Sequence, residues 1–216
     1  MNELSVVIRC RNEENHIGFA IQSVIDHFYP YEPEIIIVDN GSTDESMKVV
    51  SLFDRYDIKK YSIDKNYTPG KALNFGVQKS TKETVLVLSA HSQITKTNLD
   101  SVVEDLKENV AVFGNQVPLY MGKRITKRYV WSHFVNCRKR DFFSEIENRY
   151  FLHNAFCFYN RQVLLDNPFD ETLSGKEDRY WIADMIEKGN HFLYDGVTNE
   201  CNHFWTPNGA TWKGIG

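Results

Sequence analysis

The sequence predicts an α/β protein with a mostly parallel, doubly wound sheet, and three observations support this fold class. Short apolar runs alternate with helical repeats through about residue 115. Residues 35–38, Ile-Ile-Ile-Val, form an apolar β-branched run, as expected of a parallel strand buried on both faces. Polar residues follow several of these runs directly, which is typical of a ligand site at the carboxyl edge of such a sheet.

Composition limits the functional classes. A chain of 216 residues with 42% hydrophobic residues can bury a full core, and a net charge of −4 gives no reason to expect nucleic-acid binding. The four cysteines (Cys10, Cys137, Cys157 and Cys201) form no Cys-x-x-Cys pair, which favours a reducing compartment. No signal-peptide pattern follows Met1, and no apolar run approaches the ~20 residues that span a bilayer. We therefore expect a cytoplasmic protein whose sequon at Asn66 is not glycosylated.

The elements of the first half can be taken in order. Residues 4–8 predict a strand, and apolar residues at helical spacing from Ile17 to Phe28 predict the helix after it. After the strand at 35–38, Gly41 permits a sharp turn, and we expect Ser42 to cap a helix with Glu45 as its capping-box partner. Further strands are predicted at 58–63, 84–88 and 111–113, with helices starting at Gly70 and near residue 99.

The second half is less regular and richer in aromatic residues. Strands are predicted at 151–159 and 191–194, and a helix carrying Trp181 follows Glu177 and Asp178. No Pro/Gly/Ser-rich linker separates the halves. We therefore predict a single domain over 1–216, with one lobe at 1–116 and another at 117–216.

Residues 123–140 hold seven basic side chains and no acid. Read as a helix, the segment gathers most of these cations on one face together with Trp131 and Phe134. Such a face suits an anionic membrane surface or a lipid-linked diphosphate. The alternatives are a solvated helix face, or a basic wall that binds a soluble acidic glycan.

Asp39 is the first candidate functional residue. A carboxylate directly after a buried strand can accept hydrogen bonds from a nucleobase N–H or a ribose hydroxyl. The same position also fits an ordinary turn with a solvated aspartate.

Several motifs together resemble the family 2 glycosyltransferases, which have a GT-A fold. That fold is a Rossmann-like, mostly parallel sheet flanked by helices, with a smaller acceptor-binding lobe. The matching residues, in order, are Val6-Val7-Ile8, Arg11-Asn12-Glu13-Glu14, Ile37-Val38-Asp39-Asn40-Gly41-Ser42-Thr43-Asp44, Gly70, Asn74 and Gly76, Glu177-Asp178, and His203.

The resemblance implies an inverting transfer of a sugar from a nucleotide-sugar donor to an acceptor hydroxyl. The acceptor would be a glycan or a lipid-linked glycan in the synthesis of a bacterial surface polysaccharide or glycoconjugate. On this basis residues 1–116 bind the donor, and residues 117–216 bind the acceptor and carry the catalytic base.

Individual roles follow from the matching positions. Asp39 is expected to contact the base, Arg11 and Glu13 to flank the nucleoside, and Lys71 to reach the nucleotide. Asp178 corresponds to the catalytic base. Without the resemblance, Glu177 and Asp178 could equally be acids favoured by the dipole at a helix start, and Glu177 is expected only to orient or pack.

The sequence departs from the family pattern after the fourth strand. The family's metal-binding Asp-x-Asp is replaced by Ser89-Ala90-His91, a pattern similar to that of a bacterial subgroup. The need for a divalent cation, Mn²⁺ or Mg²⁺, is therefore in doubt, although imidazole would favour Mn²⁺. His91 is predicted to act at the donor diphosphate, through an ion with His203 as a second ligand or directly. The other five histidines and Asn74 are expected to be structural.

Other functions remain open at this stage. A nucleotide-sugar-binding protein without catalysis would explain the missing Asp-x-Asp. A nucleotidyltransferase would need a glycine-rich loop, and residues 9–13 contain no glycine. A dinucleotide oxidoreductase would need Gly-x-Gly-x-x-Gly after the first strand.

Overall fold

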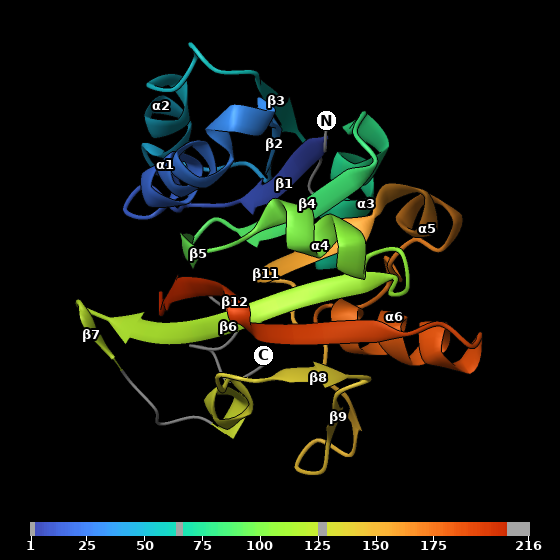
Figure 1. The fold of residues 1–216 in the computed structure, drawn as a ribbon. Coiled ribbons are helices and arrows are strands. Elements are labelled where there is room, and N and C mark those ends of the chain that lie inside the picture. The colour runs from blue at the N-terminus through green and yellow to red at the C-terminus, as the bar shows by residue number, and fades with distance from the viewer. Residues whose placement is uncertain (1–2, 64–66, 125–128, 207–216) are drawn as a thin grey trace.

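The computed structural model describes residues 3–63, 67–124 and 129–206. In this part of the chain one mixed sheet runs through both halves, in the order β3-β2-β1-β4-β11-β6-β12-β5 (Figure 1). Its first part consists of four parallel strands: β1 (Leu4–Cys10), β2 (Glu34–Asp39), β3 (Ile58–Ser62) and β4 (Thr84–Ser89). The predicted α/β class and its parallel half are therefore confirmed.

The remaining strands make the sheet more mixed and longer than predicted. β11 (Phe156–Asn160) runs antiparallel to β4 and to β6 (Ala111–Tyr120), whereas β12 (Phe192–Phe204) is parallel to β6 and antiparallel to β5 (Ser92–Lys96). The predictions for 111–113 and 191–194 were too short. Both strands continue through polar residues that form hydrogen bonds between β6 and β12. For example, Asn115 Nδ2 donates to Glu200 Oε2 at 2.8 Å.

Helices cover both faces of the sheet. α1 (Ile17–Phe28), α2 (Ser46–Ser51) and α4 (Leu99–Asp105) pack on the face that carries Val6 and Ile8. α3 (Pro69–Lys79), α5 (Arg161–Asp166) and α6 (Glu177–Glu187) pack on the face that carries Val7. Because side chains alternate along a strand, β1 serves both cores and is buried on both faces.

α3 approaches the sheet closely, which explains two of the glycines in the motif. A Cβ on Gly76 would lie 2.4 Å from Val7 Cγ1, and one on Gly70 would lie 2.6 Å from the carbonyl oxygen of Asp170. Asn74 Nδ2 donates to the Phe169 carbonyl at 2.9 Å, and Phe169 N–H donates back to Asn74 Oδ1 at 2.9 Å. Asn74 therefore has the structural role that was predicted.

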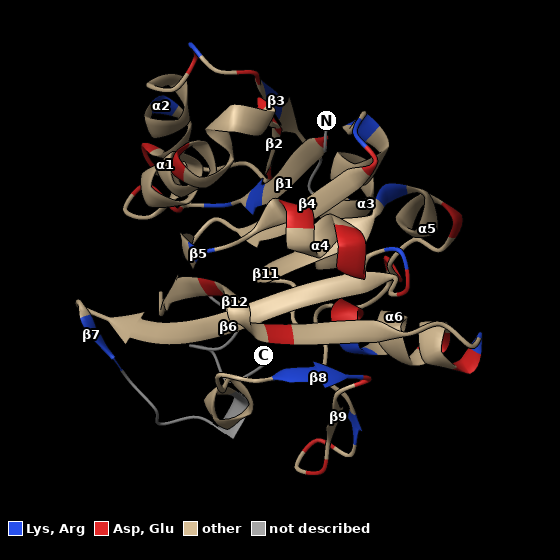
Figure 2. Cartoon of the chain, viewed as in Figure 1, with Lys and Arg blue, Asp and Glu red and all other residues tan. Residues whose placement is uncertain are grey.

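Residues 123–140 do not form the basic helix that was considered from their charge pattern. The described residues there form β7 (Lys123–Arg124), a 3-10 helix η2 (Tyr129–His133) and β8 (Arg138–Arg140), with 125–128 outside the described range. Trp131 and Phe134 are buried in the aromatic core and do not share a face with the cations. In Figure 2 the Lys and Arg positions of this segment lie along the ribbons of β7 and β8 instead.

Three short elements complete the chain. These are the 3-10 helix η1 (Tyr29–Tyr31) and the hairpin of β9 (Phe143–Ser144) and β10 (Arg149–Tyr150). Among the described residues, no helix has the length and apolar character needed to cross a bilayer. Asn66, the sequon residue, lies outside the described residues.

Candidate active site

The carboxyl ends of β1, β2 and β4 meet at one edge of the sheet. Cys10 on β1 pairs with Asp39 on β2, and Arg9 on β1 pairs with Ser89 on β4. The polar stretches that follow these strands are therefore brought together, as predicted for a parallel sheet.

Asp39 lies in a turn that its own carboxylate stabilises. Both carboxylate oxygens accept from Ser42 N–H at 3.2 Å, and Oδ1 also accepts from Ser42 Oγ at 2.6 Å. Ser42 Oγ in turn accepts from Asn12 N–H at 3.0 Å, which ties the loop after β1 to the loop after β2. The predicted helix cap at Ser42 is wrong, because this hydroxyl is engaged by Asp39 and α2 begins only at Ser46.

Asn40 adds a donor that the sequence did not single out. Its side chain is 8% exposed, and its Nδ2 has no hydrogen-bond partner among the described residues. A buried amide without a partner is costly, so a ligand acceptor at this edge would satisfy it. Arg11 is exposed in the neighbouring loop, and Lys71 is half-buried in the first turn of α3.

Glu13 and His91 form a pair in which Glu13 is buried and His91 is partly exposed. Glu13 Oε1 lies 2.9 Å from His91 Nδ1, and the Glu13 side chain is only 7% exposed. On the other side of the ring, His91 Nε2 lies 3.1 Å from Ser89 Oγ, which is within hydrogen-bond distance. The structure therefore joins two residues that were predicted separately, and Glu13 orients the imidazole.

His203 stacks on His91 and begins a second hydrogen-bonded chain. The two rings lie 5.0 Å apart at 24°. His203 Nδ1 donates to Gln116 Oε1 at 2.8 Å, and Gln116 Nε2 donates to His153 Nδ1 at 3.0 Å. Burial holds the pKa values of His203 and His153 well below the ordinary value, so both rings are neutral. His153, expected to be structural, belongs to this site.

These residues do not fit a divalent-ion site like that of Asp-x-Asp. Among the described residues, no three His, Cys, Asp or Glu side chains are arranged to hold a metal ion. Nearly parallel rings also direct their in-plane lone pairs along similar lines, so an ion between His91 and His203 would lie off at least one ring plane. Hard cations prefer carboxylate oxygens, which the end of β4 lacks.

Glu177 and Asp178 begin α6 on the other side of the site. Asp178 Oδ2 accepts from Asn154 N–H at 2.9 Å, and the same carboxylate pairs with Arg179 Nη1 at 3.0 Å. Asn154 Nδ2 lies 3.5 Å from Glu177 Oε1, and Tyr159 OH donates to Asn154 Oδ1 at 2.5 Å. Asn154 thus positions both acids, which no local sequence pattern indicated.

Arg9 is a further site residue that no sequence motif indicated. Its Nη1 donates to Tyr67 OH at 3.0 Å. Burial alone would lower its pKa, but Tyr67 and the charges of Glu177 and Asp178 raise the pKa above the ordinary value. Arg9 is therefore a fixed cation between the end of β4 and the acids of α6.

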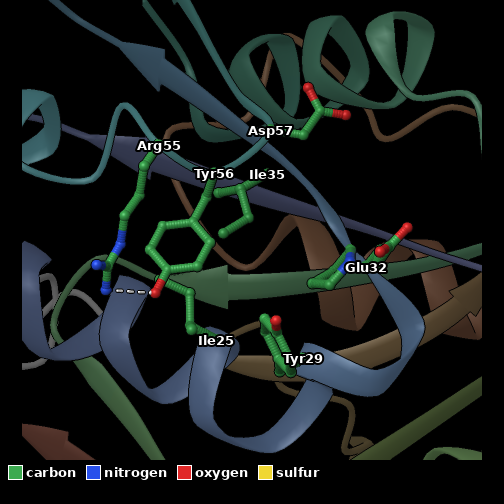
Figure 3. Close-up of a pocket in the computed structure, with 8 residues that line it drawn as sticks. Ile25, Tyr29, Glu32, Ile35, Arg55, Tyr56 and Asp57 are labelled. Carbon is green, nitrogen blue, oxygen red and sulfur yellow. Dashed lines mark hydrogen bonds between the residues drawn. The ribbon is translucent and has the colours of Figure 1, made fainter.

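A separate surface pocket lies at the amino end of β2. Figure 3 shows Tyr29, Arg55 and Tyr56 around it, with Arg55 Nη2 donating to Tyr56 OH at 2.7 Å. None of the predicted site residues lines this pocket. It is therefore distinct from the site at the carboxyl edge.

Comparisons with known proteins give matches along most of the chain. The family model described as "Glycosyl transferase family 2" matches residues 5–167. A poly-beta-1,6-N-acetyl-D-glucosamine synthase of Staphylococcus epidermidis is 30% identical over 193 residues, which cover 85% of this chain and 43% of that protein. The chain thus spans less than half the length of this relative.

Solved structures share the fold at lower identity. The crystal structure of S. aureus TarS 1-349 in complex with UDP-GlcNAc matches with a TM-score of 0.72 and 19% identity, covering 96% of this chain and 60% of that one. The crystal structure of GalNAc-T7 with UDP, GalNAc and Mn²⁺ matches with a TM-score of 0.74 and 15% identity, covering 97% and 45%.

Glu177→Gln should increase the free energy of unfolding at pH 7. Burial raises the pKa of Glu177 above its ordinary value of 4.5, Arg9 partly opposes this rise, and Asp178 adds to it. The folded state therefore favours the protonated acid, so the wild type loses stability as the pH rises from 4.5 through the folded pKa. Urea denaturation across this range should show an advantage for the variant that disappears below pH 4.5.

The exposed Glu187, at the other end of α6, provides the matched control. Glu187→Gln should change the free energy of unfolding by no more than about 0.5 kcal/mol at either pH. A Glu177→Gln variant that is less stable than wild type at pH 7 would contradict the assignment.

Proposed function

We propose that this chain, which belongs to glycosyl transferase family 2, transfers a sugar from a nucleotide-sugar donor to an acceptor hydroxyl with inversion. Family membership confirms the resemblance predicted from the motifs, and the matched structures confirm the GT-A fold. The observation that carries the proposal is one sheet edge that gathers Asp39 and the Glu13–His91 pair, with Arg9 at the same edge interacting with Asp178 at the start of α6.

UDP-N-acetylglucosamine is the first donor to test. The staphylococcal relative is named as a poly-N-acetylglucosamine synthase, and a TarS structure of the same fold holds UDP-GlcNAc. We propose a surface polysaccharide or a related glycoconjugate as the product. In this assignment the base lies against Asp39 and Asn40, Arg11 and Glu13 flank the nucleoside, and Lys71 reaches the nucleotide.

The reaction follows from the roles of the residues. The acceptor oxygen attacks the anomeric carbon as its bond to the diphosphate oxygen breaks, and the electron pair leaves with the diphosphate. Asp178 takes the acceptor proton. Asn154 and Arg179 hold its carboxylate in place, and protein cations offset the charge on the leaving group.

The acceptor and its location belong to the same proposal. A glycan or lipid-linked glycan would bind over residues 117–216, at the cytoplasmic face of the membrane. Exposed cations on β7 and β8 support contact with an anionic surface, although Arg138 pairs with Asp105 at 2.6 Å and Arg140 with Glu108 at 3.9 Å. The proposed membrane contact therefore depends on the exposed cations of two short strands and not on a basic helix.

Asp178→Asn should lower turnover by roughly 10²–10⁴-fold, the usual contribution of a general base, and leave UDP affinity nearly unchanged. UDP release from UDP-GlcNAc with a glycan acceptor measures turnover, and calorimetry measures affinity. Asp184→Asn, an exposed position on the same helix, is the control and should keep full turnover. Wild-type protein that binds UDP-GlcNAc but never releases UDP would support the binding protein without catalysis instead.

Asp39→Ala should weaken UDP binding by about 1–3 kcal/mol, because bound polar groups of the base are left without a partner. Ser42→Ala separates this effect from damage to the turn, since it removes the hydrogen bond to Asp39 and keeps the carboxylate. Calorimetry should show a clear loss only for Asp39→Ala. Equal losses in the two variants would assign Asp39 to the turn alone.

Lys123→Glu/Arg124→Glu should abolish sedimentation of the protein with anionic liposomes at low salt, because both side chains are exposed on β7. Added salt should also release the wild type, since it screens exposed charges. Wild-type protein that stays in the supernatant at low salt would contradict membrane contact and leave the glycosyltransferase assignment intact.

A further inference from the structure

The end of β4 combines two features that bear on how the donor diphosphate is held. The strand ends in Ser89 and continues to His91, so it offers a hydroxyl and an imidazole in place of two carboxylates. Directly opposite Ser89, β1 presents Arg9. Neighbouring residues in register lie on the same face of a sheet, so the guanidinium and the hydroxyl are directed to the same side.

Arg9 is held at this position by groups from two other segments. Tyr67, in the loop before α3, accepts its hydrogen bond at 3.0 Å. The carboxylates of Glu177 and Asp178, on α6, interact with its charge. In the proposed reaction the diphosphate lies between the nucleoside, which binds at Asp39, and the catalytic base, Asp178. Arg9 lies between these two sites.

His91 is fixed beside it. Glu13 engages Nδ1 at 2.9 Å, Ser89 lies 3.1 Å from Nε2, and the ring stacks on His203. Each contact restricts the imidazole, and together they hold it with its face against a second ring. This arrangement orients a hydrogen-bonding group and does not direct two ring nitrogens toward one ion.

We propose that the donor diphosphate binds without a divalent ion, with Arg9 supplying the positive charge and the Ser89 hydroxyl, held in place by His91, supplying a hydrogen bond at the end of β4. The inference rests on the proposed function. Arg9 has the permanent charge and planar donor geometry that suit phosphate oxygens. When the bond from the anomeric carbon to the diphosphate oxygen breaks, the guanidinium offsets the charge that develops on the leaving group.

Calorimetric titration of the full chain with UDP, GDP, CDP and dTDP, in excess EDTA and then in excess MnCl₂, tests this directly. At least one nucleotide should bind in EDTA with an affinity that Mn²⁺ leaves unchanged. Binding that requires Mn²⁺ would overturn this inference and leave the donor assignment standing. Absence of binding in both conditions would overturn the donor assignment and this inference with it.

Arg9→Gln should weaken nucleotide binding roughly 10- to 100-fold in EDTA, the usual worth of hydrogen bonds to a charged group. Its remaining affinity should also depend less on salt. Arg55→Gln, at the pocket on the opposite edge, is the matched control and should bind like wild type. An Arg9→Gln variant that melts at a lower temperature but binds normally would show that Arg9 only balances the acids of α6.

A gain-of-dependence variant provides the sharpest check. Ser89→Asp/His91→Asp restores two carboxylates at the end of β4, so nucleotide binding should weaken in EDTA and recover when Mn²⁺ is added. Circular dichroism and thermal melting establish that this variant is folded before it is used. A folded variant whose nucleotide affinity is the same with and without Mn²⁺ would contradict the proposal that Arg9 replaces a divalent ion at the diphosphate.

Discussion

The parallel pairing of β1 with both β2 and β4 is the constraint on which the site depends. Val6, Val7 and Ile8 are completely buried and serve the cores on the two faces of the sheet. A slip of one residue would exchange those faces, so core packing fixes the register. The same register places Arg9 opposite Ser89 and Cys10 opposite Asp39. The geometry of the polar edge is therefore set by apolar burial elsewhere in the strand.

The opposite wall of the site depends on polar burial. Asp178, Arg179 and Glu147 form a connected group under Phe151, with the Arg179 guanidinium 4.6 Å from that ring and 3.6 Å from Glu147. Burying charges costs free energy, which is offset only when partners and hydrogen bonds satisfy them. Asn154 supplies those hydrogen bonds to both acids of α6. The site thus holds carboxylates away from water without leaving the Asp178 charge unpaired.

Local patterns predicted the parallel half well, because buried strands and amphipathic helices carry their periodicity within a few residues. Gly76 and Asn74 were also identified from their motif. Contacts between distant segments were not predictable in this way. Asn154 contacts Asp178, which lies 24 residues later in the chain, and Arg9 contacts Tyr67, which lies 58 residues later. The helical interpretation of 123–140 placed Trp131 and Phe134 on the same face as the cations, whereas the structure buries both rings.

Arg9 and the missing carboxylates on β4 are physically linked. An aspartate at position 89 would lie in register with Arg9 and, without a metal ion, would pair with it, which would leave the guanidinium less available to a bound diphosphate. A serine there leaves the guanidinium with Tyr67 and with the acids of α6, one of which favours its protonated form. A carboxylate at position 89 would therefore make diphosphate binding depend on a metal ion that takes up its charge. This chain carries serine at position 89, in register with Arg9, and so fits diphosphate binding without a metal ion.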